Sequence, residues 1–198
     1  DTSARRSKLN ESQWVSVLST PDVEAAVGTT RDAGGTVHVR PTDLPGRGRL
    51  AVVSDPEGAL LALLRTTTGD PPARRAGIGD WLWTELWTAD PTSAGAFYAG
   101  LAGYDVERRT ILEDIAYDVF TIAGDPRAGM IPLPDDSIRP HWLPYVRVED
   151  AAALAAEVEA LGGRVLLDPS KGARRGSVAI VLDPTGAPLA LQEWENPS

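Results

Sequence analysis

The chain has 198 residues, of which 42% are hydrophobic and 24% charged, and its formal net charge is −9 at pH 7. This length suits one or two packed domains, and the acidic balance argues against a nucleic-acid partner or an anionic membrane surface. The absence of cysteine excludes disulfides, thiolate metal sites and thiol catalysis.

No apolar run is long enough to span a bilayer and no signal peptide is visible, so we expect a cytoplasmic protein, with export still compatible. A polar lead over residues 1–12 precedes the first predicted unit. Apolar alternation, a capping aspartate and glycine stops predict its elements. They are a strand at 14–19, a helix at 22–34, and strands at 37–40, 49–54 and 59–65.

A Thr-, Pro-, Arg- and Gly-rich segment over 67–79 indicates a linker, and two more units follow it. The second has a strand at 81–88, a helix from Asp90-Pro91 to Gly103, and strands at 106–112, 116–122 and 129–133. The third has a strand at 142–148, a helix from Asp150 to Gly162-Gly163, and strands at 164–167, 177–182 and 188–193. Each unit is therefore predicted to consist of a strand, a helix and three further strands.

The first and third units are copies of one another. Trp14 to Leu63 reappears without a gap as Trp142 to Leu191, an offset of 128 residues. Matched pairs include the capping residues Asp22 and Asp150 and the turns that begin at Asp55 and Asp183. A repeat of this length indicates a supersecondary unit that cannot bury its apolar face alone.

Several motifs carry a resemblance to a known superfamily. They are Asp90-Pro91, Phe97-Tyr98 and Gly103-Tyr104 in the middle unit, the Leu161-Gly162-Gly163 stop, and the Asp-Pro-x-Gly-Ala turns at 55–59 and 183–187. From residue 13 to 194 the chain resembles the vicinal oxygen chelate (VOC) superfamily. That group contains glyoxalase I, fosfomycin- and bleomycin-resistance proteins and extradiol dioxygenases. The resemblance implies an α+β fold of βαβββ units, paired into curved mixed sheets around a cavity.

The resemblance also suggests how the units pair. The middle unit looks like a first half of a VOC domain, and the outer units look like second halves. We therefore expect an orphan unit at 1–66, a linker at 67–79 and a complete two-unit domain at 80–198. Tandem members carry four units, so a first unit is expected to be missing. The orphan unit should then associate with that missing unit or form a homo-oligomer, because an uncovered apolar face favours association.

The metal ligands of the superfamily have no counterpart in this sequence. The resemblance places the ligands of the opening strands seven residues before the capping aspartates, at Trp83, Leu143 and Val15. The glutamate of the closing strand falls at Ala190 and Ala62. Indole, aliphatic and methyl groups cannot hold a divalent ion. We therefore expect no cofactor, with a divalent metal as the disfavoured alternative.

Strand alternation predicts the residues that line the cavity instead. The expected ligand-binding residues are Trp83, Glu85, Trp87, His141, Tyr145, Arg147 and Gln192. Tyr117, Phe120 and Met130 are expected to add apolar wall. Packing remains an alternative for tryptophans that begin strands, and an ion pair remains one for Glu85 and Arg147. In an enzyme, Glu85 would be the candidate general base and Tyr145 the acid.

Two functions therefore compete, with a third that concerns assembly. The first is a protein of the glyoxalase and bleomycin-resistance type, which binds a small, partly aromatic molecule without a metal. The acidic charge favours a cationic ligand. The alternative is a metal-dependent lyase, isomerase or dioxygenase of the same fold. In the third, the first unit docks a protein partner; neither a nucleic acid nor a membrane is expected as partner.

Overall fold

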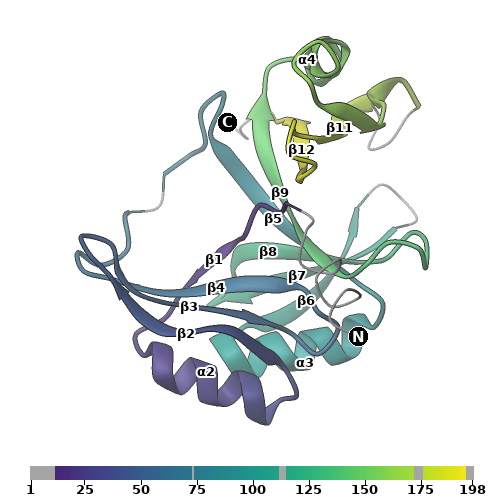
Figure 1. Ribbon diagram of the computed structural model, residues 1–198. Helices are drawn as coiled ribbons and strands as arrows, with labels where there is room; N and C mark the ends of the chain where they lie inside the picture. The colour runs from purple at the N-terminus through teal and green to yellow at the C-terminus, as the bar shows by residue number, and fades with distance from the viewer. Residues whose placement is uncertain (1–11, 73, 112–114, 172–175, 195–198) are drawn as a thin grey trace, which may run out of the picture. The chain divides into compact units, whose positions relative to one another are not determined.

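The computed structural model describes residues 12–72, 74–111, 115–171 and 176–194 (Figure 1). It contains three successive βαβββ modules, which we call the first, middle and third module, so the α+β class and the repeat order are confirmed. Among the described residues, no helix is both long and apolar enough to cross a membrane.

The elements follow the predicted order. The first module comprises β1 (Val17–Ser19), α2 (Val23–Asp32), β2 (Thr36–Leu44), β3 (Gly48–Ser54) and β4 (Leu60–Thr66). The middle module comprises β5 (Trp81–Thr88), α3 (Pro91–Ala102), β6 (Asp105–Ile111), β7 (Ile115–Ile122) and β8 (Asp125–Pro132). The third comprises β9 (His141–Val148), α4 (Ala151–Val158), β10 (Arg164–Leu167), η1 (Pro169–Lys171), β11 (Val178–Leu182) and β12 (Pro188–Glu193).

Each helix begins where the sequence predicts, because a side-chain carboxylate satisfies amides of its first turn. Asp22 accepts from Ala25 N at 2.9 Å, and Asp150 accepts from Ala153 N at 2.8 Å. Asp90 accepts from the amides of two residues in the first turn of α3. The three helix starts are therefore local features of the chain.

Two strands extend four residues beyond a predicted bound, whereas β1 is shorter than predicted, because it begins at Val17 and not at Trp14. β2 continues to Leu44, past the expected end at Arg40, because two shifts of its register against β3 carry the strand past Pro41. β8 begins at Asp125 instead of Gly129, because Ala123 and Gly124 both take positive φ, 52° and 83°. That conformation closes a tight hairpin, so β7 and β8 pair from the turn onward.

The chain divides into two compact units. The larger unit consists of residues 15–73 and 84–142, and the smaller unit consists of residues 1–14, 74–83 and 143–198. The larger unit holds a complete sheet of order β1-β4-β3-β2. In the second sheet the order is β10-β11-β12-β9-β5-β8-β7-β6, and its neighbours β9 and β5 both contribute residues to each unit.

One hydrophobic core joins the first and middle modules inside the larger unit. α2 and α3 lie side by side there (Figure 1). The core contains Val27 of α2, Leu63 of β4, Leu86 of β5 and Phe97 of α3, each buried. Burying apolar area of this kind is the main contribution to the stability of the larger unit.

Polar groups inside this core bind the two modules to each other. The Tyr98 hydroxyl donates to Asp55 Oδ2 at 3.0 Å and accepts from the Trp142 indole at 3.0 Å. The Asp55 Oδ1 atom accepts from three amides of its own turn. Glu57, in the same turn, accepts from the hydroxyl of Thr88 and from two backbone amides just before α3.

This arrangement differs from the predicted domains. The sequence leaves residues 1–66 without a partner, whereas the structure packs the helix side of the first module against the middle module. The repeat pattern could not reveal this contact between modules. The contact includes a hydrogen bond from Tyr98 of the middle module to Asp55 of the first module, and these residues are far apart in the sequence. A separate domain at 80–198 stays a prediction.

We expect Gly35→Ala to lower the free energy of unfolding by about 1–3 kcal/mol. A Cβ at Gly35 would lie 2.5 Å from the Ser54 carbonyl oxygen, which is backbone and cannot move aside. The matched control is Gly28→Ala inside α2, where a Cβ meets nothing within 4 Å. That change should stabilise by about 0.5–1 kcal/mol through helix propensity. Urea unfolding measures both, and equal stabilities of the two variants would contradict the prediction.

Candidate functional site

Two predicted ligand-binding residues meet on β5 in the larger unit. Glu85 and Trp87 lie two residues apart and therefore share one face of the strand. The Trp87 indole Nε1–H donates to Glu85 Oε2 at 3.0 Å, and the Glu85 side chain is fully buried. Leu86 between them faces the hydrophobic core. The predicted alternation on β5 is confirmed at these positions.

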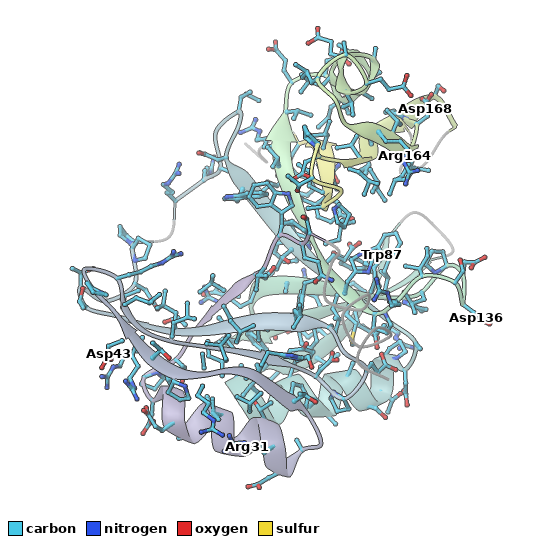
Figure 2. The ribbon with its side chains drawn as sticks, viewed as in Figure 1. Arg31, Asp43, Trp87, Asp136, Arg164 and Asp168 are labelled. Carbon is cyan, nitrogen blue, oxygen red and sulfur yellow. The ribbon has the colours of Figure 1, made fainter. Side chains whose placement is uncertain are left out.

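His141 at the start of β9 completes this group, which we call the Glu85–Trp87–His141 group (Trp87 is labelled in Figure 2). The ring centroids of Trp87 and His141 are 5.5 Å apart, with the planes tilted by 44°. His141 Nδ1 lies 2.8 Å from the Arg139 carbonyl oxygen. Burial lowers the pKa of the imidazole below its ordinary value of 6.5. The neutral ring then donates from Nδ1 and keeps the Nε2 lone pair as an acceptor or base.

The same sheet face carries polar residues that the sequence prediction left out. Glu85, Gly129, Val119 and Glu107 are register partners across β5, β8, β7 and β6. Glu107 accepts from Arg109 and Thr121, and the hydrogen bond from Arg109 is the main reason that its pKa is lowered. The sequence could have indicated these residues, because the alternation of β6 places Glu107 and Arg109 on one face.

Two predicted wall residues face the other way. Gly129 and Val119 share the sheet face of Glu85, so their chain neighbours Met130 and Phe120 point to the opposite face. Phe120 and Met130 accordingly belong to the hydrophobic core of the larger unit. The prediction that these two residues line the site is therefore wrong. Tyr117, two residues before Val119, is buried on the expected face.

The other four predicted ligand residues lie in the smaller unit: Trp83, Tyr145, Arg147 and Gln192. Arg147 pairs with Gln192 in the register of β9 and β12, and Tyr145 pairs with Ala190. Arg147 Nη1 donates to the Ala76 carbonyl at 2.6 Å. Gln192 donates to Glu193 O at 3.0 Å and to Ser177 Oγ at 3.3 Å. The predicted set is thus divided between the units, and its role in binding stays a prediction.

The side chains at the expected metal-ligand positions cannot coordinate a metal ion. Leu143 is 1% exposed and Ala190 is fully buried, and neither side chain offers a lone pair. In the part of the chain that the structure describes, no three His, Asp or Glu side chains gather closely enough to ligate an ion. Function without a metal nevertheless stays a prediction.

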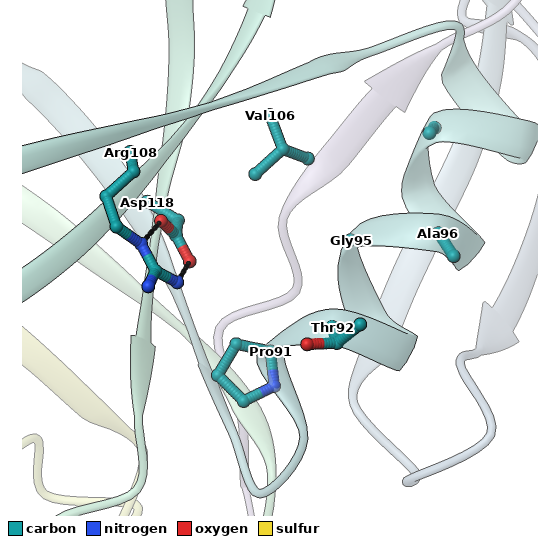
Figure 3. Close-up of a pocket in the computed structure, with 8 residues that line it drawn as sticks. Pro91, Thr92, Gly95, Ala96, Val106, Arg108 and Asp118 are labelled. Carbon is teal, nitrogen blue, oxygen red and sulfur yellow. Dashed lines mark hydrogen bonds and ion pairs between the residues drawn. The ribbon is translucent and has the colours of Figure 1, made fainter.

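A hollow of about 440 Å³ lies elsewhere on the larger unit, between α3 and strands β6 and β7 (Figure 3). Its walls include Gly95, Ala96 and Val106, with the ion pair Arg108–Asp118 at one side. Asp118 pairs in register with Met130, which pairs with Leu86, so this side of the sheet is opposite to that of Glu85. Arg108 Nε and Nη2 donate to the two carboxylate oxygens of Asp118 at 2.8 and 2.9 Å, so the two charges beside the hollow neutralise each other.

The His141 pKa leads to a pH prediction. We expect the imidazole to titrate below 6.5, so the ring stays neutral through the physiological range. Because the folded pKa is depressed, its contribution to stability is present above 6.5 and is lost as pH falls through the folded pKa. Proton NMR of the ring Hε1 signals measures this, with His38→Gln to assign the resonances. A midpoint at or above 6.5 would contradict the burial of the ring.

Comparison with known sequences places the chain among glyoxalase-like proteins. The model of the glyoxalase-like domain family matches residues 83–192. CFP32 of Mycobacterium tuberculosis (strain CDC 1551 / Oshkosh), named as a glyoxylase, is 30% identical over 174 residues, covering 88% of this chain and 67% of that protein. The anthracycline biosynthesis protein DnrV of Streptomyces peucetius is 34% identical over 184 residues, covering 91% and 65%. The chain thus spans about two thirds of the length of these relatives.

Solved structures show the same fold at low identity. The Mn(II)-bound glyoxalase from Novosphingobium aromaticivorans superposes with a TM-score of 0.55 at 16% identity, over 89% of this chain and 61% of that one. The 2,2',3-trihydroxybiphenyl 1,2-dioxygenase of Sphingomonas wittichii strain RW1 gives 0.56 at 13% identity, over 93% and 71%. At such identities the likeness extends to the fold alone.

Proposed function

Because the chain belongs to the glyoxalase-like domain family of the VOC superfamily, we propose that it binds a flat, cationic, partly aromatic small molecule without a divalent metal. The contact site would be the Glu85–Trp87–His141 group. The observation that carries the proposal is the buried Glu85 carboxylate held at 3.0 Å by the indole of a half-buried tryptophan. Aromatic surface beside a few oriented polar groups is the usual composition of a small-molecule site.

The charge of the group selects the ligand. A Trp face attracts a cation through its quadrupole, and the Glu85 carboxylate, which is itself fully buried, adds a negative charge close to that face. The net charge of −9 also attracts cationic ligands over long distances. His141 Nε2, as an acceptor, would take an N–H or O–H of the ligand. A protonated amine on a fused-ring system combines these features.

The names of two relatives agree with this ligand class. DnrV and DauV are both named for anthracycline biosynthesis, and anthracyclines are fused-ring aromatic compounds. The relatives extend beyond the length of this chain, so their biosynthetic role supports the aromatic class and no particular compound.

Isothermal titration tests the proposal with two matched probes. 9-Aminoacridine is a cation at neutral pH, and acridine has the same fused rings but is neutral. We expect saturable binding of the cation, weaker binding of the neutral ring, and loss of both in Trp87→Ala. Heat signals that are equal for both probes and unchanged in Trp87→Ala would overturn the proposal.

The alternative from the sequence is a metal-dependent lyase, isomerase or dioxygenase of the same fold. Its fold is shared by a Mn(II)-bound glyoxalase and a dioxygenase, but at 16% and 13% identity that likeness extends to the fold alone. Trp83, Leu143 and Ala190 stand against it, because none of these side chains can be a ligand. Elemental analysis of protein purified without chelator separates the two functions, since stoichiometric Mn, Fe, Ni or Zn would favour the enzyme.

A further inference from the structure

A second hollow lies in the first module, where the β2–β3 hairpin meets the end of β4, and we call it the hairpin hollow. Its volume is about 550 Å³, and Asp43, which contributes to it, is labelled in Figure 2. Its polar walls are Arg49, Arg65, Thr66 and Thr67, and its apolar walls are Leu44 and Pro45. The hollow lies wholly within the larger unit, and none of its lining residues belongs to the predicted ligand-binding set.

A glycine brings the hairpin close to β4 at this point. Gly48 pairs in register with Thr66 and takes a positive φ of 128°. A Cβ at Gly48 would strike the carbonyl oxygen of Arg65, so a larger residue does not fit. The backbone of Arg65 and Thr66 is thereby held against the hairpin.

The two arginines of the hairpin hollow face each other across a strand pair. Arg49 of β3 and Arg65 of β4 are register partners, so their Cβ atoms share one face and lie about 4.5–5.5 Å apart. Like charges directly opposite each other are destabilising. In the part of the chain that the structure describes, no hydrogen bond or ion pair joins the Arg65 side chain to another residue. An anion between the two guanidiniums would remove their repulsion.

Two carboxylates contact Arg49, but both are open to solvent. Arg49 Nε donates to Glu24 Oε1 at 2.6 Å, and Arg49 Nη1 lies 2.9 Å from Asp43 Oδ1. The side chains of Glu24 and Asp43 are 55% and 81% exposed. Exposed ion pairs contribute only about 0–1 kcal/mol each. A bound anion can therefore displace Asp43 from Arg49 at little cost, and Arg65 would supply the second guanidinium.

The internal repeat shows that the fold does not require this arginine pair. At the offset of 128 residues, Arg49 and Arg65 correspond to Ser177 and Glu193 of the third module. The Glu193 carboxylate accepts from Ala151 N at the start of α4, at 2.9 Å. The third module thus carries a negative charge where the first module carries a positive one. The stability of a βαβββ module therefore does not explain the two arginines.

We propose that the hairpin hollow binds a small organic phosphate monoester. A phosphate monoester carries a charge of about −1.5 to −2 at pH 7, which matches two guanidiniums, and the guanidinium fork suits its oxygens. The hydroxyls of Thr66 and Thr67 can donate to further oxygens. Leu44 and Pro45 offer apolar contact to the organic part, and the volume lies in the usual range of small-molecule sites.

Isothermal titration with phenyl phosphate at constant ionic strength tests the proposal. We expect saturable binding to the full chain and a loss of about tenfold or more in Arg65→Met, which removes the charge and keeps an unbranched side chain. The matched control is Arg164→Met on β10, another exposed arginine on a strand, which should bind as the unchanged chain does. Equal affinities of the two variants, or no saturable binding to the unchanged chain, would refute the site.

Two further probes identify the group that is recognised. Benzoate has the same ring with a planar monoanion, and inorganic phosphate has the anion without a ring. Both should bind more weakly than phenyl phosphate. Benzoate that binds as tightly would rule out recognition of phosphate. The binding of 9-aminoacridine should be unchanged in Arg65→Met, so this proposal and that for the Glu85–Trp87–His141 group stand or fall separately.

A gain of affinity gives a second test that does not depend on how well Arg65→Met folds. Asp43→Asn removes the exposed carboxylate that competes for Arg49. This variant should bind phenyl phosphate about two- to fivefold more tightly, the range expected when one exposed ion pair no longer has to be broken. Affinity that is unchanged or weaker would show that the anion does not contact Arg49.

Discussion

Asp55→Ala should lower the free energy of unfolding by about 3–4 kcal/mol, as the loss of hydrogen bonds to a buried charged group does. The Asp55 carboxylate accepts from the amides of Glu57, Gly58 and Ala59 through one oxygen and from the Tyr98 hydroxyl through the other. Alanine leaves the buried Tyr98 hydroxyl without its acceptor. Urea unfolding followed by tryptophan fluorescence measures the loss.

The internal repeat supplies the control for this experiment. Asp183 occupies the same turn in the third module, but it is only half-buried, and it accepts from Thr185 and Ala187 of its own turn. Asp183→Ala should therefore destabilise clearly less than Asp55→Ala. Equal losses would mean that the turn itself matters and that the contact of Asp55 with Tyr98 does not.

The two aspartates should also respond to pH in opposite ways. Burial raises the pKa of Asp55 above 3.8, so its contribution to stability is present below 3.8 and declines as pH rises through the folded pKa. The hydrogen bond from Thr185 lowers the pKa of Asp183, so its contribution is present above 3.8 and is lost as pH falls. Asp55→Asn keeps an acceptor for the turn and should remove the first dependence. Carboxyl carbon NMR shifts measure both pKa values.

Glu85→Gln should weaken the binding of 9-aminoacridine about 10- to 100-fold, the range of a charge-assisted interaction in a buried site. Glutamine keeps the size of the side chain and an acceptor for the Trp87 indole, so the change removes only the negative charge. Acridine binding should change by about threefold or less, because the neutral ring does not use that charge. Isothermal titration at constant salt measures both affinities.

The control for this charge is Glu107→Gln. Glu107 stands on the same face and in the same row as Glu85, but on β6, with β8 and β7 between them. Strands lie about 4.8 Å apart, so Glu107 is roughly 14 Å away. Its removal should leave the affinity for 9-aminoacridine nearly unchanged. If the two variants weaken binding equally, the ligand responds to net charge and Glu85 does not contact it.

Much of the fold could be predicted because its signals are local. A capping aspartate satisfies amides of its own first turn, as Asp22, Asp90 and Asp150 do. Gly35 and its repeat Gly163 are required where a Cβ would strike a carbonyl of a following strand, at 2.5 and 2.4 Å. The alternation that places Glu85 beside Trp87 involves one strand only. Such signals need no knowledge of distant contacts.

The candidate site was predicted only in part. Glu85, Trp87 and His141 come together as a group, whereas Phe120 and Met130 point into the core. Their direction follows from the register in which β8 and β7 pair with β5 and with each other. A register depends on two strands at once, so the alternation of a single strand cannot reveal it.

By itself, the sequence determined the three βαβββ modules, their helix starts, their turns and their repeat, since these depend on residues a few positions apart. Only the tertiary structure decided what each repeated residue does. Asp55 and Asp183 stand in the same kind of turn, yet their pKa values shift in opposite directions. The cause is that Asp55 is buried against Tyr98 of another module, whereas Asp183 stays partly open to solvent. Burial depends on which modules meet, and that is a property of the folded chain.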